Sequence, residues 1–403
     1  MARDKTPPAP NLYPFEQYCS SAAEMHNWIL SGGSVVDRSM AITSLLVKAR
    51  QLGLAVVALH CSNPFFALQT QSRLWREQLP IYDPLAGKSP TQIADILTDV
   101  GVNALDTDKR IFVLIELVAE IIAASEESIT LPNVLGFPIN TLLKRLETLE
   151  ADDTITAKQR KEFTDRYSGA ASECVAETRR LFSRLKNAWT SQQKAQQYTS
   201  LQEAISARQI ISFDLVTDTN PVLKELLFSD INAAMQRGSR FLLIADGLSI
   251  LGKDNANTDM VLLRNHDNIS LVYSAADVPQ MAMHKDDYFY TLTGGMANLI
   301  LFRHNNAESA KKWSGFFGQE WAEITGTTVS DSKEKYTFFK GSTSTAVTTN
   351  MQRIDKLPPE YFTDIPFDQG LGFLVYNERN GEQAILPTEM SHLREDILQC
   401  LIR

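Results

Sequence analysis

A glycine-containing segment near the N-terminus matches in part the residue order that binds phosphate groups in many proteins. The apolar, strand-like run His26–Leu30 is followed by Ser31-Gly32-Gly33-Ser34-Val35-Val36-Asp37-Arg38-Ser39, and a run of helix-forming residues begins at Met40. Strand, loop and helix form the context in which the pattern G-x-x-x-x-G-K-[ST] wraps phosphates in backbone N–H groups. The candidate nucleotide-binding residues here are Gly32, Gly33, Arg38 and Ser39.

Two positions of this pattern carry a different chemical group. Asp37 replaces the second glycine, so a Cβ and a negative charge stand where a flexible backbone would meet a negative ligand. Arg38 replaces the lysine and keeps its positive charge, but a planar guanidinium is not equivalent to a compact ammonium. Asp37 could also pair with Arg38. The segment is therefore either a degenerate nucleotide site or an ordinary strand–helix turn.

Two further strand ends show the same combination of expected position and missing group. The apolar run Phe241–Ala245 is followed by Asp246. In nucleotide-binding proteins, a strand of this kind ends in a carboxylate that orients Mg²⁺ beside the phosphate loop. Hydrolysing enzymes usually have glutamate next, and Gly247 stands there. Ala276 follows the next strand, where a polar sensor of the γ-phosphate is expected. Any buried strand can end in aspartate, but three such coincidences indicate a nucleotide-binding architecture without its chemistry. We predict no catalytic residue, no metal site and no resident cofactor, with ATP and Mg²⁺ as the ligands to test.

The surrounding pattern predicts an α/β fold. Continuous apolar runs of strand length alternate with helical segments, as buried parallel strands require. Residues 96–209 instead carry apolar residues at helical spacing only. A basic cluster lies within them, made of Arg179, Arg180, Arg184 and Lys186. It is either a solvated helix face or a contact surface for nucleic acid or an acidic partner. We expect one mainly parallel sheet flanked by helices, with strands near Trp28, Val57, Phe213, Leu243, Val272 and Ile300. Its domain would comprise 21–95 and 210–403, interrupted by an all-α domain at 96–209 and preceded by a disordered tail at 1–20. Leu79–Asp83 is expected to be a weaker strand, and Gly341–Asn350 a polar loop.

Composition narrows the class of protein. The 403 residues are 44% hydrophobic and carry a formal net charge of -9, so charge does not indicate DNA as a partner. The scattered cysteines Cys19, Cys61, Cys174 and Cys400 argue against a disulfide framework or a zinc site. The apolar run Ile111–Ala124 is too short to span a bilayer. We expect a soluble cytoplasmic protein without direct membrane insertion.

Several segments, taken in order, resemble the cytoplasmic ATPase domain of type IV secretion and conjugation coupling proteins. The resemblance runs over roughly Trp28 to Ile385 and is strongest to the Dot/Icm and IncI-plasmid branch of these TraG/TraD-like proteins. Its segments are the degenerate loop, Val56–Leu59, Ile81-Tyr82-Asp83-Pro84-Leu85 with Ser89–Ile93, Ile211–Leu215, Leu227–Ile231, Ala276–Pro279, Asn298–Phe302, Glu308-Ser309-Ala310 and Trp313.

This resemblance implies a RecA-like P-loop ATPase fold with an inserted all-α domain. Members of the family assemble as hexamers, bind ATP between subunits and pass DNA–protein substrates to a secretion channel. The implied partners are other proteins of the secretion or conjugation apparatus, a coupling ATPase paralogue or further copies of the chain, and DNA, at a place peripheral to the inner membrane. The family's usual N-terminal membrane anchor does not occur in these residues, which leaves open a truncated chain or a soluble paralogue.

Two functions remain open at this point. The first is a non-hydrolysing structural or adaptor subunit, a pseudo-ATPase that uses the fold as a protein-binding platform. The second is an active DNA- or protein-translocating ATPase whose site is completed by a neighbouring subunit.

Overall fold

The structure is a computed structural model of the 403-residue chain. It describes residues 13–14, 25–60, 63, 81–125, 127–188, 198–214, 221–236, 240–247, 269–282, 286–294, 298–331, 343–377 and 383–395. By its internal contacts the chain divides into two compact units, one made of 1–302 with 367–403 and the other of 303–366. The sequence predicts a different division, with an all-α domain at 96–209 separate from the α/β domain. The two contact-based units do not test these boundaries, which remain a prediction.

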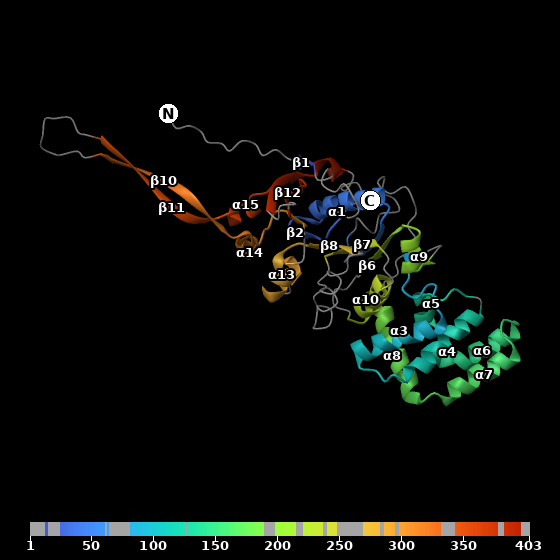
Figure 1. The fold of residues 1–403 in the computed structure, drawn as a ribbon. Coiled ribbons are helices and arrows are strands. Elements are labelled where there is room, and N and C mark those ends of the chain that lie inside the picture. The colour runs from blue at the N-terminus through green and yellow to red at the C-terminus, as the bar shows by residue number, and fades with distance from the viewer. Residues whose placement is uncertain are drawn as a thin grey trace, which may run out of the picture. The chain divides into compact units, whose positions relative to one another are not determined.

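The first unit contains a nine-stranded sheet with the order β1-β13-β12-β9-β2-β8-β7-β3-β6 (Figure 1). The six strands from β9 to β6 in this order are all parallel. They are β2 (Trp28–Ser31), β3 (Ala55–His60), β6 (Ile210–Asp214), β7 (Phe241–Asp246), β8 (Ile269–Ala275) and β9 (Asn298–Leu301). Each contains or adjoins one of the six predicted positions, so the prediction of one mainly parallel α/β sheet is confirmed.

Three strands extend the sheet beyond β9. Strand β12 (Leu371–Asn377) is antiparallel to both β9 and β13 (Gln383–Glu389), and β1 (Tyr13–Pro14) lies parallel to β13. The segment expected as a disordered tail therefore contributes two residues to a strand. The weak strand predicted at Leu79–Asp83 is β4 (Ile81–Tyr82), which pairs with β5 (Tyr198–Thr199) in a sheet of its own instead of joining the large one.

Helix α1 (Val35–Gln51) follows β2 after only three residues. Its N-terminus is defined by a capping box, in which the Ser34 hydroxyl accepts from the N–H groups of Val36 and Asp37 while the Asp37 side chain accepts from the Ser34 N–H. The helix is buried along most of its length, and Met40, Leu45 and similar residues pack with β2, β3, β7 and β8 in one apolar core. The sheet therefore holds α1 firmly at the strand ends.

The helical segments of the first unit form a second apolar core, and Figure 1 shows α4, α6, α7 and α8 gathered together. On α8 the basic side chains Arg179, Arg180, Arg184 and Lys186 are exposed, whereas Leu181 and Leu185 are fully buried. Trp189, which follows Leu181 and Leu185 at the same four-residue spacing, lies outside the described residues. The helices of this segment are α3 (Pro90–Leu105), α4 (Ile111–Ala124), α5 (Leu131–Gly136), the 3₁₀ turn η3 (Ile139–Thr141), α6 (Leu142–Ala151), α7 (Ala157–Gly169) and α8 (Ser172–Ala188).

Among its described residues, the first unit also contains α9 (Leu201–Ser206), α10 (Pro221–Gln236), α12 (Val278–Ala282), α13 (Asp286–Thr293) and the 3₁₀ turn η4 (Ser391–Leu393). Within the described residues, none of the helices combines the length and the apolar character that a membrane crossing requires.

A buried carboxylate joins the turn after β4 to the helical segment. Asp83 is fully buried, and its two oxygens accept hydrogen bonds from the N–H groups of Leu85 and Leu131, each at 2.8 Å. Leu131 is the first residue of α5, so Asp83 satisfies one of the open N–H groups at that helix end. Burial raises the pKa of Asp83 to about 6, and the N–H groups act in the opposite direction.

We expect this carboxyl group to make folding stability depend on pH. Because its pKa is about 6 when folded and near 3.8 in an unfolded chain, the folded state binds the proton more tightly. The contribution of the protonated Asp83 carboxyl group to the free energy of unfolding is complete below about pH 3.8. It is lost as pH rises through 6, a change on the order of 2–3 kcal/mol. Urea unfolding of wild type and Asp83→Asn at pH 4.5 and pH 7 measures it. The stability of the wild type relative to the variant should fall at pH 7; a difference independent of pH would contradict this assignment.

The second unit contains a long hairpin and two short helices. Strands β10 (Gln319–Asp331) and β11 (Thr343–Asp355) pair antiparallel along 13 residues each, and α14 (Ala307–Phe317) packs near α15 (Pro359–Thr363). Gly341–Asn350 was expected to be a polar loop, but from Thr343 onward it is strand. Its threonines explain the difference, because β-branched side chains favour extended backbone even where the sequence is polar.

Candidate functional site

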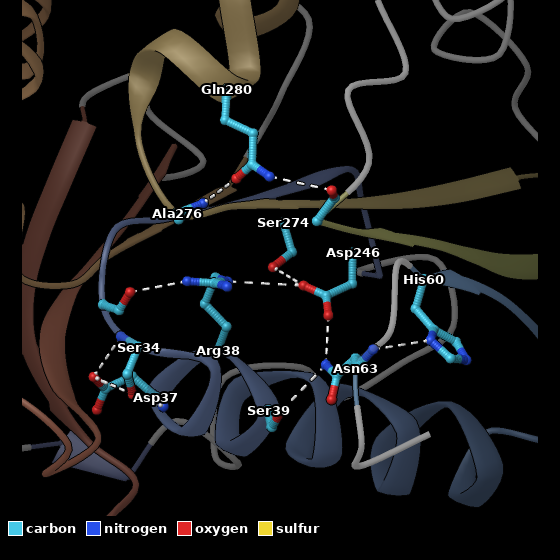
Figure 2. Close-up of polar contacts among 12 residues, drawn as sticks. Ser34, Asp37, Arg38, Ser39, His60, Asn63, Asp246, Ser274, Ala276 and Gln280 are labelled. Carbon is cyan, nitrogen blue, oxygen red and sulfur yellow. Dashed lines mark hydrogen bonds and ion pairs between the residues drawn. The ribbon is translucent and has the colours of Figure 1, made fainter. Parts of the chain in front are cut away.

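The carboxyl ends of β2, β3, β7 and β8 bring the predicted site residues together. Asp246, the last residue of β7, lies beside His60 at the end of β3 and beside Ser274 of β8. Arg38 and Ser39 reach the same place from helix α1 (Figure 2). Four strand ends and one helix therefore form a single polar cluster, and the parallel strands place its members by ending at one edge of the sheet.

Both oxygens of the Asp246 carboxylate are engaged. Oδ1 accepts a hydrogen bond from the Ser274 hydroxyl at 2.6 Å, and Oδ2 accepts one from the Asn63 side-chain amide at 2.5 Å. The side-chain amide of Asn63 also lies 3.4 Å from the Ser39 hydroxyl, to which it donates. Asp246 is only 2% exposed. The group expected to orient Mg²⁺ is thus held within a buried hydrogen-bond network.

The Arg38 side chain is hydrogen-bonded to the backbone of the loop between β2 and α1. Its Nη1 donates to the carbonyl oxygens of Gly33 at 2.9 Å and Gly32 at 3.3 Å, and its Nε lies 3.8 Å from Oδ1 of Asp246. Figure 2 shows the guanidinium between the loop and the β7 strand end. The sequence suggested pairing of Arg38 with Asp37; this is wrong, because the two side chains leave α1 in different directions and Arg38 pairs with Asp246 instead.

The loop itself is shorter than the phosphate-binding pattern requires. Only Gly32, Gly33 and Ser34 separate β2 from α1, so Asp37 to Ser39 lie within the helix and not in a loop. Gly32 and Gly33 have φ of 85° and 66°, a region that glycine alone adopts readily. The N–H of Gly32 donates to the carbonyl oxygen of Ala275 at 3.0 Å. The helix starts early because Ser34 and Asp37 form its cap, which the sequence pattern alone did not reveal.

Asp37 bonds to backbone from two distant segments. Oδ2 accepts from the N–H of Ser34 at 3.0 Å, from the Ser34 hydroxyl at 3.2 Å and from the N–H of Asp368 at 3.2 Å. Oδ1 accepts from the N–H of Gly370 at 2.9 Å. The side chain that seemed only to disturb a phosphate loop therefore links α1 to the turn before β12.

Three contributors to the site were not singled out from the sequence: Asn63, Ser274 and Gln280. The polar residue at the end of β8 is Ser274, two residues before the position at which Ala276 was expected to replace a sensor. Gln280 of α12 accepts from the N–H of Ala276 at 2.7 Å and donates to the carbonyl oxygen of Gly247 at 3.1 Å. Strand register could have identified Ser274, because it pairs directly with Asp246. Asn63 and Gln280 lie outside strands, where sequence pattern carries no register.

The residues present do not fit ATP with Mg²⁺ in this arrangement. The cation that would meet the γ-phosphate donates to the loop carbonyls. The acid that would orient the metal accepts from Ser274 and Asn63 and lies beside Arg38, and Ser39 accepts from Asn63. Among the described residues, no group of three or more His, Cys, Asp or Glu side chains could hold a metal ion. The site is a closed polar cluster that stabilises the strand ends.

Comparison with known proteins supports the fold. No protein-family model and no curated protein matches the sequence. The structure is similar to the plasmid coupling protein TrwB solved with the non-hydrolysable GTP analogue GDPNP, with a TM-score of 0.51 and 12% identity, and with the ATP analogue ADPNP, with a TM-score of 0.51 and 13% identity. An unbound monoclinic form of the bacterial conjugative coupling protein TrwBdeltaN70 gives 0.50 and 12%. Each alignment covers 91% of this chain and 86% of the other. The chain has the mixed α/β P-loop ATPase fold of these proteins, in which helices flank a mostly parallel sheet and a helical region is also present.

Proposed function

We propose that this chain is a coupling-protein-like component of a type IV secretion or conjugative transfer apparatus that does not hydrolyse ATP. It would act as a structural or adaptor subunit, using the fold as a platform for other proteins of the apparatus. The observation that carries this proposal is the closure of the loop by Arg38, whose guanidinium donates to the Gly33 carbonyl oxygen and lies beside Asp246.

The physical basis is that phosphoryl transfer depends on positioning and on electrostatic stabilisation of the transferred group. A cation that donates inward to its own loop is not oriented toward an incoming phosphate. A metal ion at Asp246 would compete with the hydrogen bonds that its two oxygens accept from Ser274 and Asn63. Gly247 offers no side chain to activate water. Opening the site for a nucleotide would therefore cost several buried contacts at once.

A steady-state phosphate-release assay tests the lack of hydrolysis. With ATP and Mg²⁺, and with or without DNA, we expect release at the background of a buffer blank, because Arg38 is directed to the loop carbonyls and Gly247 has no side chain to activate water. Turnover of about 1 s⁻¹ or more, the low end for ordinary enzymes, that vanished in Asp246→Ala but persisted in Asp99→Ala would contradict the proposal. Asp99 is an exposed aspartate of α3 and serves as the matched control.

A transfer assay in the host tests the adaptor role separately. Loss of the chain should abolish secretion or conjugative transfer, and complementation with folded Asp246→Asn should restore it as well as the wild type does. Restoration by the wild type alone would favour the alternative, an active translocating ATPase. That alternative is kept because the coupling protein with the same fold has been solved with nucleotide analogues.

A further inference from the structure

The hairpin of the second unit has two open edges. Strands β10 and β11 pair with each other along 13 residues each, and no third strand joins them within the part of the chain that the structure describes (Figure 1). A two-stranded ribbon is marginally stable by itself in water, and the N–H and C=O groups along its outer edges are a template for a further strand. Each outer edge is therefore a place where another chain can add to the sheet.

The register of the hairpin fixes which backbone groups of β10 face outward. The N–H of Lys356 donates to the carbonyl oxygen of Gly318 at 3.0 Å, immediately before the first residue of β10. Hydrogen-bonded and non-hydrogen-bonded pairs alternate in an antiparallel ladder, so Trp321 and Glu323 belong to non-hydrogen-bonded pairs. The close side-chain contact of such a pair is present, because the Arg353 guanidinium lies 5.1 Å from the ring centre of Trp321. The N–H and C=O groups of Trp321 and Glu323 consequently point away from β11, along the outer edge of β10.

The side chains at this edge suit a basic protein segment. Trp321 is 61% exposed, and the two glutamates near it, Glu320 and Glu323, are exposed as well. The ion pairs among the described residues include neither glutamate. Tryptophan and arginine are enriched where proteins bind one another, so the Trp321–Arg353 pair favours a protein partner. The two carboxylates repel phosphate groups, which argues against nucleic acid and for a partner with basic side chains.

Strand β10 also lacks the features that prevent edge strands from pairing with other chains. Natural proteins protect such edges with lysine or proline, with a bulge, or by keeping the strand short. Strand β10 contains no lysine and no proline. Its described residues pair with β11 in one unbroken register over 13 positions, so this length contains no bulge. The edge is long and regular, as the addition of a third strand requires.

We propose that the outer edge of β10 around Glu320–Glu323 is a docking site for an extended segment of a partner protein that carries basic side chains. The segment adds to the ribbon as a third strand. Backbone hydrogen bonds to Trp321 and Glu323 align it, and its lysine or arginine side chains pair with Glu320 and Glu323. An acidic segment is rejected, because like charges on neighbouring strands repel. A second copy of β10 would bring the same two glutamates, which disfavours pairing of this edge with itself.

A synthetic peptide tests the proposal on the full chain. The probe is a fluorescent peptide of about eight residues, within the usual strand length, made of valine and threonine with two lysines three positions apart, the spacing of Glu320 and Glu323. Its control has glutamate in place of both lysines. Fluorescence anisotropy at low salt should show saturable binding of the lysine peptide with a Kd below about 1 mM. The glutamate peptide should not bind.

Two proline variants locate the edge. The N–H of residue 323 faces outward, so Glu323→Pro leaves the pairing of β10 with β11 intact but removes a donor that a third strand needs. Binding of the lysine peptide should be lost. Met351→Pro is the matched control, because Met351 pairs with Glu323 and faces outward on the opposite edge, along β11. This variant should bind the peptide as the wild type does. Circular dichroism and thermal unfolding of both variants check that they fold.

A charge-reversed variant gives a second, independent measurement. Glu320→Lys combined with Glu323→Lys should weaken binding of the lysine peptide by about fivefold or more and should bind the glutamate peptide instead. The proposal is wrong if the wild type does not bind the lysine peptide, if both peptides bind equally, or if Met351→Pro loses binding as Glu323→Pro does. Sedimentation that shows self-association of the wild type, lost in Glu323→Pro, would identify a second copy as the occupant instead. None of these measurements depends on ATP hydrolysis or transfer, so the outcome is independent of the proposed function.

Discussion

Arg38→Ala is expected to lower the free energy of unfolding by about 3 kcal/mol or more. The substitution leaves the buried Asp246 carboxylate without the cation beside it, and removing one partner of a buried ion pair costs roughly 3–5 kcal/mol. The carbonyl oxygens of Gly32 and Gly33 lose their side-chain donor at the same time. The free energy of unfolding of Arg38→Lys should lie between those of the wild type and Arg38→Ala, because lysine keeps the charge but cannot donate to the loop as the planar guanidinium does.

A double-mutant cycle with Asp246→Asn separates the pair from its surroundings. Neutralising Asp246 removes the charge that Arg38 balances, so Arg38→Ala should cost less in that background, with a coupling of about 1 kcal/mol or more. Urea unfolding at pH 7 measures all four proteins. Arg179→Ala, an exposed position on α8, should change stability by less than about 0.5 kcal/mol. Fully additive effects of Arg38→Ala and Asp246→Asn would show that the two side chains do not interact.

Gly33→Ala is expected to destabilise the protein by about 2–4 kcal/mol. Gly33 has φ of 66°, which an alanine adopts only with strain, and a Cβ there would lie 2.8 Å from Cβ of Phe302 and 2.9 Å from Cβ of Asp37. Backbone strain and overpacking each cost roughly 1–3 kcal/mol. The loop is packed against β9 and α1 on both sides, so neither neighbour can withdraw without disturbing the core.

Gly136→Ala supplies the matched control for that substitution. Gly136 ends helix α5 with a negative φ, and apart from its chain neighbours and its own helix backbone no atom lies within 4 Å of an added Cβ. Alanine there should be neutral or stabilising by up to about 1 kcal/mol. Thermal unfolding of the two variants beside the wild type gives the comparison. A Gly33→Ala protein as stable as Gly136→Ala would mean that the loop is open and free to rearrange, as a working phosphate cradle would be.

The central strands were predictable because their signal is local. Buried parallel strands need apolar side chains on both faces, so β3 and β7 appear in the sequence as continuous apolar runs bounded by polar residues. Asp246 could be assigned to a strand end on the same basis. The contacts of Asp246 with Asn63 and Arg38 could not be predicted, because the order of strands brings these side chains together and no local pattern contains that order.

The start of α1 shows a second limit to what the sequence pattern can predict. A motif aligned by residue type placed Asp37, Arg38 and Ser39 in a loop, but Ser34 and Asp37 together form a capping box that begins the helix at Val35. Cap and motif use the same residue types at similar spacing. The N–H groups of Asp368 and Gly370 help to hold Asp37 in place, and they come from more than 300 positions further along the chain.

The sequence by itself determined the α/β class, the six parallel strands and the presence of loop residues that depart from a phosphate-binding pattern, since apolar periodicity and residue type are properties of short segments. Only the tertiary structure decided what those departures do. Arg38 faces Asp246 and the loop carbonyls, and Asp37 faces the turn before β12, because a nine-stranded sheet brings segments far apart in sequence to one edge. Buried charges must find partners wherever the fold places them, and those partners are set by topology and not by neighbouring residues.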